Sequence, residues 1–251
     1  MTIPAKACFG ALLALSALSA LPATAQAQAI PSGPLTVSGG VSVVSDYRFR
    51  GLSRSDGKVE VQSTISVDHD SGLYAGVWGS GLPDTPRYGQ YELDLFAGYA
   101  TEVAPGTSLD VGATYYVYPG HRDGAGASDY VELSGRLSHD LGPLSATATL
   151  AYAPDQKALG RDDNLYLNLG LSSGIPNTPV TLSANLGYTD GALGALAGDR
   201  NYLDWSLGAS VVNGPVTLSA RYIDTDIRKT GVKAVDRLYD PTLVFSIGLS
   251  F

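Results

Sequence analysis

The chain has 251 residues and is acidic, with 16 Lys and Arg residues against 24 Asp and Glu residues. The net charge of −8 argues against nucleic acid as a partner, because phosphate binding requires a basic surface. Its one cysteine, Cys8, lies in an N-terminal segment that we expect to be removed, so the remaining chain has no disulfide and no thiol ligand or nucleophile.

The N-terminus has the pattern of a secretory signal peptide, which we predict over residues 1–27. Lys6 supplies a positive charge, an apolar stretch follows to Leu21, and small residues then alternate with polar ones, as at a cleavage site. Three cleavage sites fit the pattern, after Ala25, Ala27 or Ala29. Residues 28–34 are expected to form a short periplasmic lead-in. No later apolar run approaches the roughly 18 residues of a membrane helix.

From Leu35 onwards, apolar and polar residues alternate in twelve segments, which predicts strands with one apolar face. No charged residue falls on the apolar face of any segment. Alternation alone also suits a soluble β-sandwich, whose apolar face is its core. The segments cover residues 35–49, 59–68, 73–77, 90–99, 109–117, 131–137, 144–152, 164–171, 180–188, 203–211, 216–222 and 242–251.

The links between these segments alternate in length, and this favours a membrane barrel over a sandwich. Links after the even-numbered segments are short, as at residues 140–143, whereas those after odd-numbered segments are longer, as at 119–129 and 224–241. Outer-membrane barrels have short turns on one rim and long loops on the other. An even strand count places both termini on the short-turn, periplasmic rim.

Aromatic residues fall at the ends of the apolar faces, as in the girdles of membrane barrels. The predicted girdle consists of Tyr47, Phe49, Tyr91, Tyr115, Tyr152, Tyr188 and Tyr222 near the loop rim, and of Tyr99 and Phe251 near the other rim. We therefore predict an all-β, antiparallel up-and-down transmembrane β-barrel over residues 35–251. About twelve strands are expected, with ten or fourteen left open.

Three segments carry a family resemblance: Ser45-Asp46-Tyr47-Arg48-Phe49-Arg50-Gly51, residues 71–80 and residues 91–95. They resemble the TorF-type family of outer-membrane porins, most strongly over about residues 35–119. The resemblance implies a Gram-negative outer membrane and a pore, and it names no solute. The expected partners are outer-membrane lipid, small solutes or ions, and the barrel-assembly machinery, the last through the strand ending in Phe251.

The polar faces of the strands are expected to line the lumen. The predicted pore-lining residues are Asp46, Arg48, Arg50, Glu60, Asp68, Glu92, Asp94, Asp110, Glu132, Arg136, Asp204 and Arg221. Rings of such charges would bias ion passage, here with a mild cation preference. The alternative is a closed lumen in which arginines and carboxylates satisfy one another. Tyrosines on the same face are expected mainly to fill space inside the barrel.

Catalysis is not expected, and neither a cofactor nor a metal site is predicted. The chain has only three histidines, His69, His121 and His139, and lacks a nucleophile elbow, a phosphate loop and a zinc-binding His pair. The alternatives to a porin-like channel are a non-conducting barrel with a structural or partner-binding role and an outer-membrane enzyme that would depend on His121. Whether loop 224–241 folds inward, which solute passes and what oligomer forms stay open.

Overall fold

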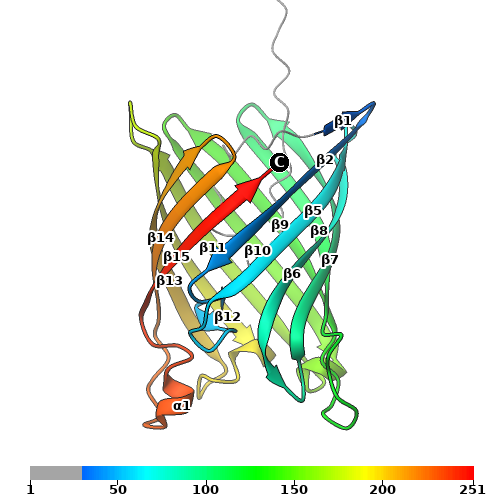
Figure 1. Ribbon diagram of the computed structural model, residues 1–251, viewed down its shortest axis with the longest axis vertical. Coiled ribbons are helices and arrows are strands. Elements are labelled where there is room, and N and C mark those ends of the chain that lie inside the picture. Colours follow the sequence, from blue (N-terminus) through cyan, green and yellow to red (C-terminus); the bar gives the residue numbers. More distant parts are fainter. Residues whose placement is uncertain (1–29) are drawn as a thin grey trace, which may run out of the picture.

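The computed structural model describes residues 30–251, so the predicted signal peptide lies outside the described residues. The chain forms one closed antiparallel barrel, in which each strand pairs with its sequence neighbours and the first wall strand pairs with the last (Figure 1). Twelve strands make the wall, as predicted, and ten and fourteen are excluded. Within residues 30–251, no helix has the length and apolarity to cross a membrane.

Most strands are longer than the sequence pattern indicated, whereas β5 has the predicted length and the first and last wall strands are shorter. The wall consists of β2 (Leu35–Val44), β5 (Glu60–His69), β6 (Leu73–Thr85), β7 (Gly89–Ala104), β8 (Thr107–Val117), β9 (Tyr130–Leu141), β10 (Leu144–Gln156), β11 (Asp162–Gly174), β12 (Val180–Gly191), β13 (Asn201–Asn213), β14 (Val216–Thr225) and β15 (Thr242–Ser250). A short strand, β1 (Ile30–Ser32), pairs with the beginning of β2.

The two rims of the barrel differ. Tight turns close the upper rim in Figure 1, where the C-terminus lies, and the loops with the short helix α1 (Lys233–Asp236) lie at the lower rim. We call these the turn rim and the loop rim. The β6–β7 link was expected to be long, but it covers only residues 86–88, because both strands extend beyond their neighbours at the loop rim.

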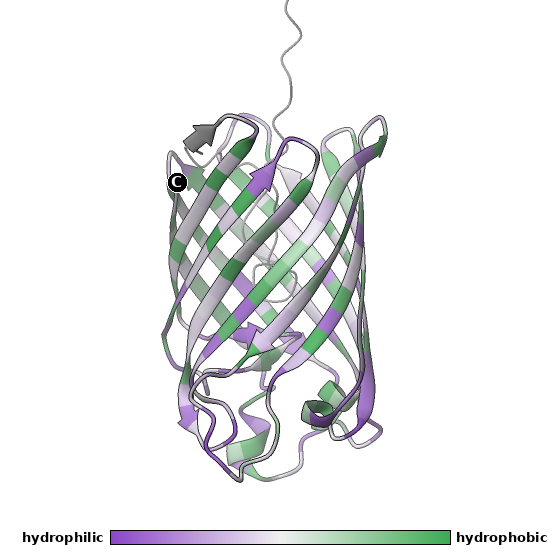
Figure 2. Cartoon of the chain, turned by 90° about the vertical axis from the view of Figure 1, so that its right-hand side faces the viewer, coloured by the Kyte–Doolittle hydropathy of each residue, from purple (hydrophilic) through white to green (hydrophobic). Residues whose placement is uncertain are grey.

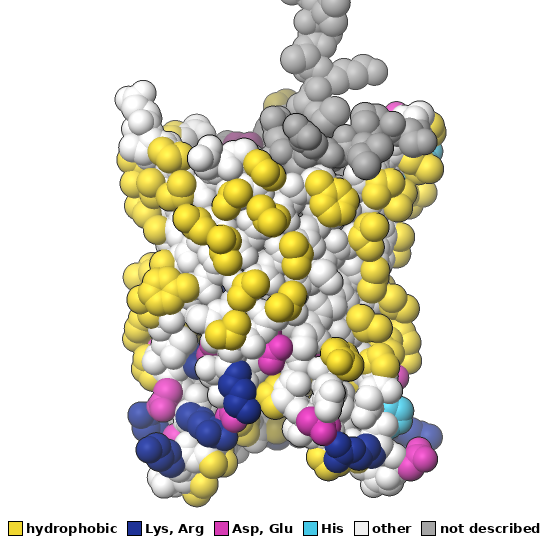
Figure 3. Space-filling model, in the orientation of Figure 1, with side chains coloured by type: hydrophobic (Ala, Val, Ile, Leu, Met, Phe, Trp, Pro, Cys, Tyr) yellow, Lys and Arg dark blue, Asp and Glu magenta, His cyan; other side chains and the backbone are white. Residues whose placement is uncertain are grey.

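Hydrophobic and hydrophilic residues alternate along the wall strands (Figure 2), and in the structure this alternation separates the outside of the wall from the inside. The outward side chains are large and exposed: Leu169 is 61% and Leu207 is 62% exposed. On the visible face, hydrophobic side chains cover the wall up to the turn rim, and charged residues gather at the loop rim (Figure 3). So extensive an apolar surface exceeds what isolated soluble domains leave uncovered.

The inside of the barrel is polar and aromatic. Fully buried side chains there include Trp78, Tyr116 and Glu92, with exposures of 0–2%. Glycines make room for them, since the Tyr74 hydroxyl occupies the place that a Cβ of Gly98 would take. As predicted, the lumen tyrosines pack against one another and against neighbouring side chains.

The first wall strand ends five residues before its predicted boundary, and this corrects part of the aromatic girdle. β2 stops at Val44, and residues 45–59 lead from there to β5. Most of residues 46–55 are buried in the lumen, whereas residues 57–59 are exposed. Tyr47 and Phe49 are 2% and 7% exposed, so they belong to the interior and their assignment to the outer girdle was wrong. The other predicted girdle residues lie on the outer surface, Tyr188 being partly covered.

Candidate functional site

The candidate site is built around residues 45–59, which we call the finger. Its base is held together by Asp46, whose carboxylate accepts hydrogen bonds from Arg48 Nε at 2.7 Å, Ser53 Oγ at 2.6 Å and Ser55 Oγ at 2.9 Å. Ser55 Oγ in turn accepts the Tyr47 N–H at 2.9 Å. These buried bonds, made within one short segment, give the finger its own internal structure.

The tip of the finger is a tight hairpin of β3 (Arg48–Phe49) and β4 (Leu52–Ser53). Arg50 and Gly51 between them have φ values of 50° and 81°, as two-residue hairpins require. Glycine is needed at the second position, because a Cβ on Gly51 would lie 2.6 Å from Thr225 Cγ2. Arginine at positive φ is uncommon, and it places the Arg50 side chain across the lumen.

Arg50 is held by an acidic and aromatic site on the wall, which we call site A. Its Nη2 donates to Glu132 Oε2 at 2.6 Å, and both side chains are only 3% exposed. The guanidinium carbon lies 4.2 Å from the centre of the Tyr166 ring, within range for a cation–π interaction. Asp204 also interacts electrostatically with Arg50. The Arg50 carbonyl accepts the Tyr202 hydroxyl at 2.9 Å.

Arg54 occupies a second such place, site B, formed by Tyr88, Tyr118, Glu92 and Asp94. Its guanidinium carbon lies 4.9 Å and 5.9 Å from the ring centres of Tyr88 and Tyr118. Arg54 Nη2 donates to the Tyr118 hydroxyl at 2.9 Å, and that hydroxyl donates to Glu92 Oε1 at 3.1 Å. Arg54 interacts electrostatically with both Glu92 and Asp94.

Aromatic side chains fill the space between the finger and the wall. The Tyr47 ring lies 5.4 Å from that of Trp78, and the Phe49 ring lies 6.1 Å from that of Tyr116. Tyr116 stacks on Tyr130 at 4.4 Å. These rings are all at most 7% exposed, so they pack the finger closely against the wall.

The loop between β14 and β15 covers the finger from the rim. Ser53 N–H donates to the Leu238 carbonyl at 2.7 Å, and Arg48 Nη1 donates to the Asp240 carbonyl at 3.0 Å. This is the loop whose inward folding the sequence left open; the segment that enters the lumen is instead the finger. The Thr230 hydroxyl, 2.7 Å from Asp236 Oδ1, and nearby backbone N–H groups lower the pKa of Asp236 to about 2.

The turn-side half of the lumen is polar and partly exposed. Asp110 and Arg136 face each other on β8 and β9, and the Tyr74 hydroxyl donates to Asp110 Oδ1 at 2.8 Å. Asp68 accepts a hydrogen bond from Ser66. Since Asp68, Asp110 and Arg136 all keep some exposed surface, this half of the lumen differs from the dry half around the finger.

All twelve predicted pore-lining residues point to the inside of the barrel, but they fall into two groups. Asp46, Arg48 and Arg50 sit on the finger, not on the wall as expected. The remaining nine lie on wall strands: Glu60, Asp68, Glu92, Asp94, Asp110, Glu132, Arg136, Asp204 and Arg221. Sequence reasoning missed Arg54 and Tyr88, because both lie outside every strand and carry no alternation signal.

The histidines do not come together. His69 and His139 are exposed near the turn rim, where they bond Ser71 and Thr107 at 2.8 Å, whereas His121 lies in the β8–β9 loop at the opposite rim. Within residues 30–251, no group of three His, Cys, Asp or Glu side chains is placed to hold a metal ion.

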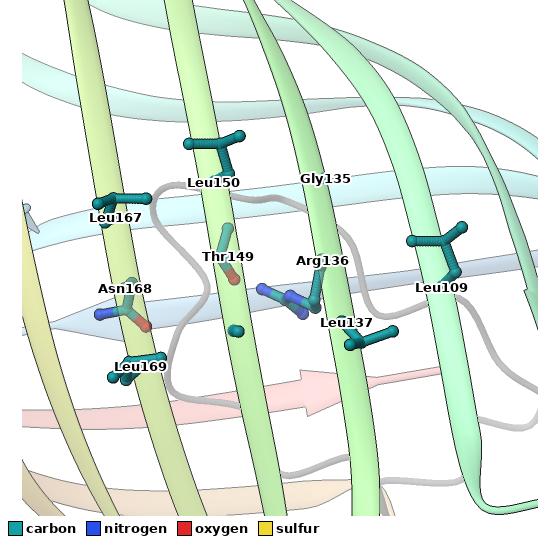
Figure 4. A pocket seen from close by; sticks show the side chains of 10 residues that line it. Leu109, Gly135, Arg136, Leu137, Thr149, Leu150, Leu167, Asn168 and Leu169 are labelled. Atoms are coloured by element: carbon teal, nitrogen blue, oxygen red, sulfur yellow. The ribbon is translucent and has the colours of Figure 1, made fainter.

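A groove on the outer wall is not a comparable candidate. Leucines of β8 to β11 surround Gly135 and Ala148, whose small size leaves a depression between them (Figure 4). Its exposed lining is almost wholly apolar, and no cluster of charges meets there. Such a depression suits a hydrocarbon chain, not a hydrophilic solute.

Comparison with known proteins places the chain in a family. The family model described as "Bacterial protein of unknown function (Gcw_chp)" matches residues 28–251. The chain belongs to this family. No curated protein matches the sequence.

Solved structures share the fold. A NanC porin is 12% identical, with a TM-score of 0.55, over 86% of this chain and 98% of the porin. A KdgM porin is 10% identical, with a TM-score of 0.54, over 85% and 98% of the two chains. The KdgM porin in complex with disordered oligogalacturonate is 8% identical, with a TM-score of 0.55, over 86% and 97%. The barrel is therefore one that porins also use.

Proposed function

We propose that the Gcw_chp protein is a porin-like channel of a Gram-negative outer membrane, which passes small hydrophilic solutes or ions by passive diffusion. The observation that carries this proposal is a charged lumen enclosed by a wall whose outer face is apolar. Lipid satisfies such an outer face, and a polar interior is what a hydrophilic solute requires. Residues 1–27 would serve as the export signal.

The fold supports the proposal without identifying a solute. NanC and KdgM are both described as porins, and the chain spans nearly their whole length. One KdgM structure is a complex with disordered oligogalacturonate, and this supports a polar solute for a barrel of this fold. The sequence resemblance to the TorF-type porins agrees with the same function.

The proposed channel prefers cations and is closed when the finger is docked. The predicted pore-lining residues together with Arg54 comprise eight carboxylates and five arginines, and an acidic excess favours cations. In this proposal, passage requires the finger to leave sites A and B, because buried aromatic rings pack between the finger and the wall. The charged residues of the turn-side half would then line the continuous pore.

The dry packing around the finger favours one competing function, a non-conducting barrel that binds a partner through its loops. A permanently docked finger would act there as a structural plug. We propose no enzymatic activity, since the three histidines lie on opposite rims and are exposed. In either case, lipid would contact the wall, and the barrel-assembly machinery would recognise the terminal strand ending in Phe251.

Recordings in planar bilayers separate the two functions. The wild-type protein and the variant Arg50→Ala/Arg54→Ala are compared, because the variant lacks both guanidinium groups that hold the finger. The channel predicts brief steps of current for wild type, frequent steps for the variant and a cation-selective reversal potential across a salt gradient. A correctly folded variant without steps would support the plug, and anion selectivity would contradict the predicted preference.

A further inference from the structure

Sites A and B share one chemical character, although they are built from different strands. Each combines carboxylates with tyrosine rings: Glu132, Asp204 and Tyr166 in site A, and Glu92, Asp94, Tyr88 and Tyr118 in site B. Carboxylates and aromatic faces together recognise planar organic cations, because guanidinium both donates hydrogen bonds in a plane and stacks on rings.

Both sites hold an arginine side chain in the docked state, and both arginines belong to the finger. Arg50 and Arg54 are four positions apart on the finger, and they enter neighbouring sites on the wall. Arg50 contacts Glu132 of β9 and Tyr166 of β11, and Arg54 interacts with Glu92 and Asp94 of β7. The wall therefore binds guanidinium groups that are presented to it by a loop.

Site B has acceptor capacity beyond what Arg54 uses. Glu92 and Asp94 are each 2% exposed, and within residues 30–251 neither Glu92 Oε2 nor Asp94 Oδ1 makes a hydrogen bond of good geometry, although the Tyr47 hydroxyl of the finger interacts with Glu92. Buried carboxylate oxygens demand a donor. The two sites together hold four carboxyl groups, those of Glu92, Asp94, Glu132 and Asp204, so the two finger arginines do not use all of the acceptor oxygens of the wall.

We infer that sites A and B are recognition sites for solutes bearing guanidinium groups, and that the finger is a tethered occupant which such a solute displaces. Free arginine or an arginine-containing peptide presents the same planar cation as Arg50 and Arg54. Competition for the sites would undock the finger and open the lumen, so the solute would control its own passage. This inference rests on the proposed channel function and names its substrate class.

Displacement of the finger can be measured by fluorescence, without recording a current. Trp78 is 0% exposed and packs on Tyr47 of the finger, so undocking brings water to its indole and shifts its emission to the red. The chain has two tryptophans, and Trp205→Phe leaves Trp78 as the only reporter. L-arginine is titrated into this detergent-solubilised barrel, and L-citrulline, which replaces guanidinium by neutral urea, serves as the matched ligand.

We expect L-arginine at millimolar concentration to shift the Trp78 emission to that of the Arg50→Ala/Arg54→Ala variant and to raise the open probability about tenfold or more. L-citrulline should do neither. Lys58→Gln is the control variant, because it removes an exposed finger cation that occupies neither site, and it should respond to L-arginine as wild type does.

Two results would overturn the inference. One is an emission unchanged by L-arginine although the Arg50→Ala/Arg54→Ala variant shows the red shift, and the other is an equal effect of L-citrulline. Both leave the channel function standing if the variant conducts. A folded variant that never conducts would instead refute the channel, whatever L-arginine does to Trp78.

Discussion

The substitution Glu132→Gln tests what holds the finger in the lumen. Glu132 Oε2 lies 2.6 Å from Arg50 Nη2, with both side chains 3% exposed. Removing one partner of a buried ion pair costs about 3–5 kcal/mol, and the remaining amide oxygen recovers about 1 kcal/mol as a neutral hydrogen bond. The net loss of about 2–4 kcal/mol shifts the docking equilibrium roughly 30- to 700-fold towards the undocked finger.

The emission of Trp78 in the Trp205→Phe background reports this shift, and bilayer recordings report the resulting open probability. We expect a red shift and more frequent current steps in Glu132→Gln. Heat-dependent migration of the protein in detergent gels shows whether the barrel itself has folded, so a misfolded sample is recognised.

Asp84→Asn is the matched control, since it breaks the Arg122–Asp84 pair at 2.7 Å, whose side chains are 57% and 42% exposed. Exposed pairs contribute about 0–1 kcal/mol, and this one does not touch the finger. The Arg50–Glu132 pair does not hold the finger if Glu132→Gln leaves the Trp78 emission and the open probability at the wild-type level, or if Asp84→Asn changes them as much.

Three further predictions concern the wall, its interior and the loop rim. Leu207 is 62% exposed on the outer face, so a charge there would face lipid. We expect Leu207→Arg to lower the free energy of unfolding by about 2–4 kcal/mol if the site is at mid-bilayer, as measured by urea unfolding from lipid vesicles. Asn213→Arg at the turn rim should change this free energy little. Gly98→Ala should displace the Tyr74 hydroxyl from Asp110 and destabilise the barrel by about 1–3 kcal/mol, while Gly135→Ala, with open space around it, should be neutral in the same assay. The pKa of Asp236 is lowered to about 2, so its hydrogen bonds stabilise loop 226–241 fully at pH values above the ordinary carboxyl pKa. This stabilisation is lost as the pH falls towards 2. Amide hydrogen exchange of the loop should therefore accelerate only in that acidic window, and Asp236→Asn should abolish the pH dependence.

The wall could be predicted from the sequence because each strand has one apolar and one polar face, so apolar and polar residues alternate in every segment. β13 is typical: Leu203, Leu207 and Ala209 point outward, and Asp204 and Ser206 point inward. Closure and strand count followed from the number of such segments, since an up-and-down barrel pairs each strand with its neighbours in sequence.

The finger could not be predicted from alternation, because the pattern of β2 continues after the chain has left the wall. Tyr47 and Phe49 keep the period of Val41 and Val43, although the backbone turns inward after Val44. The signals that mark the departure are local: the Asp46 carboxylate with two serines to bind, and the Arg50-Gly51 turn.

Sites A and B needed the three-dimensional structure. Glu92, Asp94 and Glu132 could be assigned to the lumen by their strand face, but their partners Arg50 and Arg54 reach them only because the finger crosses the barrel. Tyr88, between β6 and β7, completes site B from a link too short to carry any pattern.

The central claim is that the lumen is a hydrophilic passage closed by the finger. The only cysteine is Cys8, so Ser66→Cys, in a protein expressed without the proposed signal peptide, places a single thiol in the turn-side half of the lumen. Applied from the loop rim of the reconstituted barrel, a cationic, membrane-impermeant thiol reagent should label this thiol rapidly when Arg50→Ala/Arg54→Ala releases the finger and slowly when the finger is wild type. A released barrel that folds correctly and stays unlabelled from that side would contradict the account.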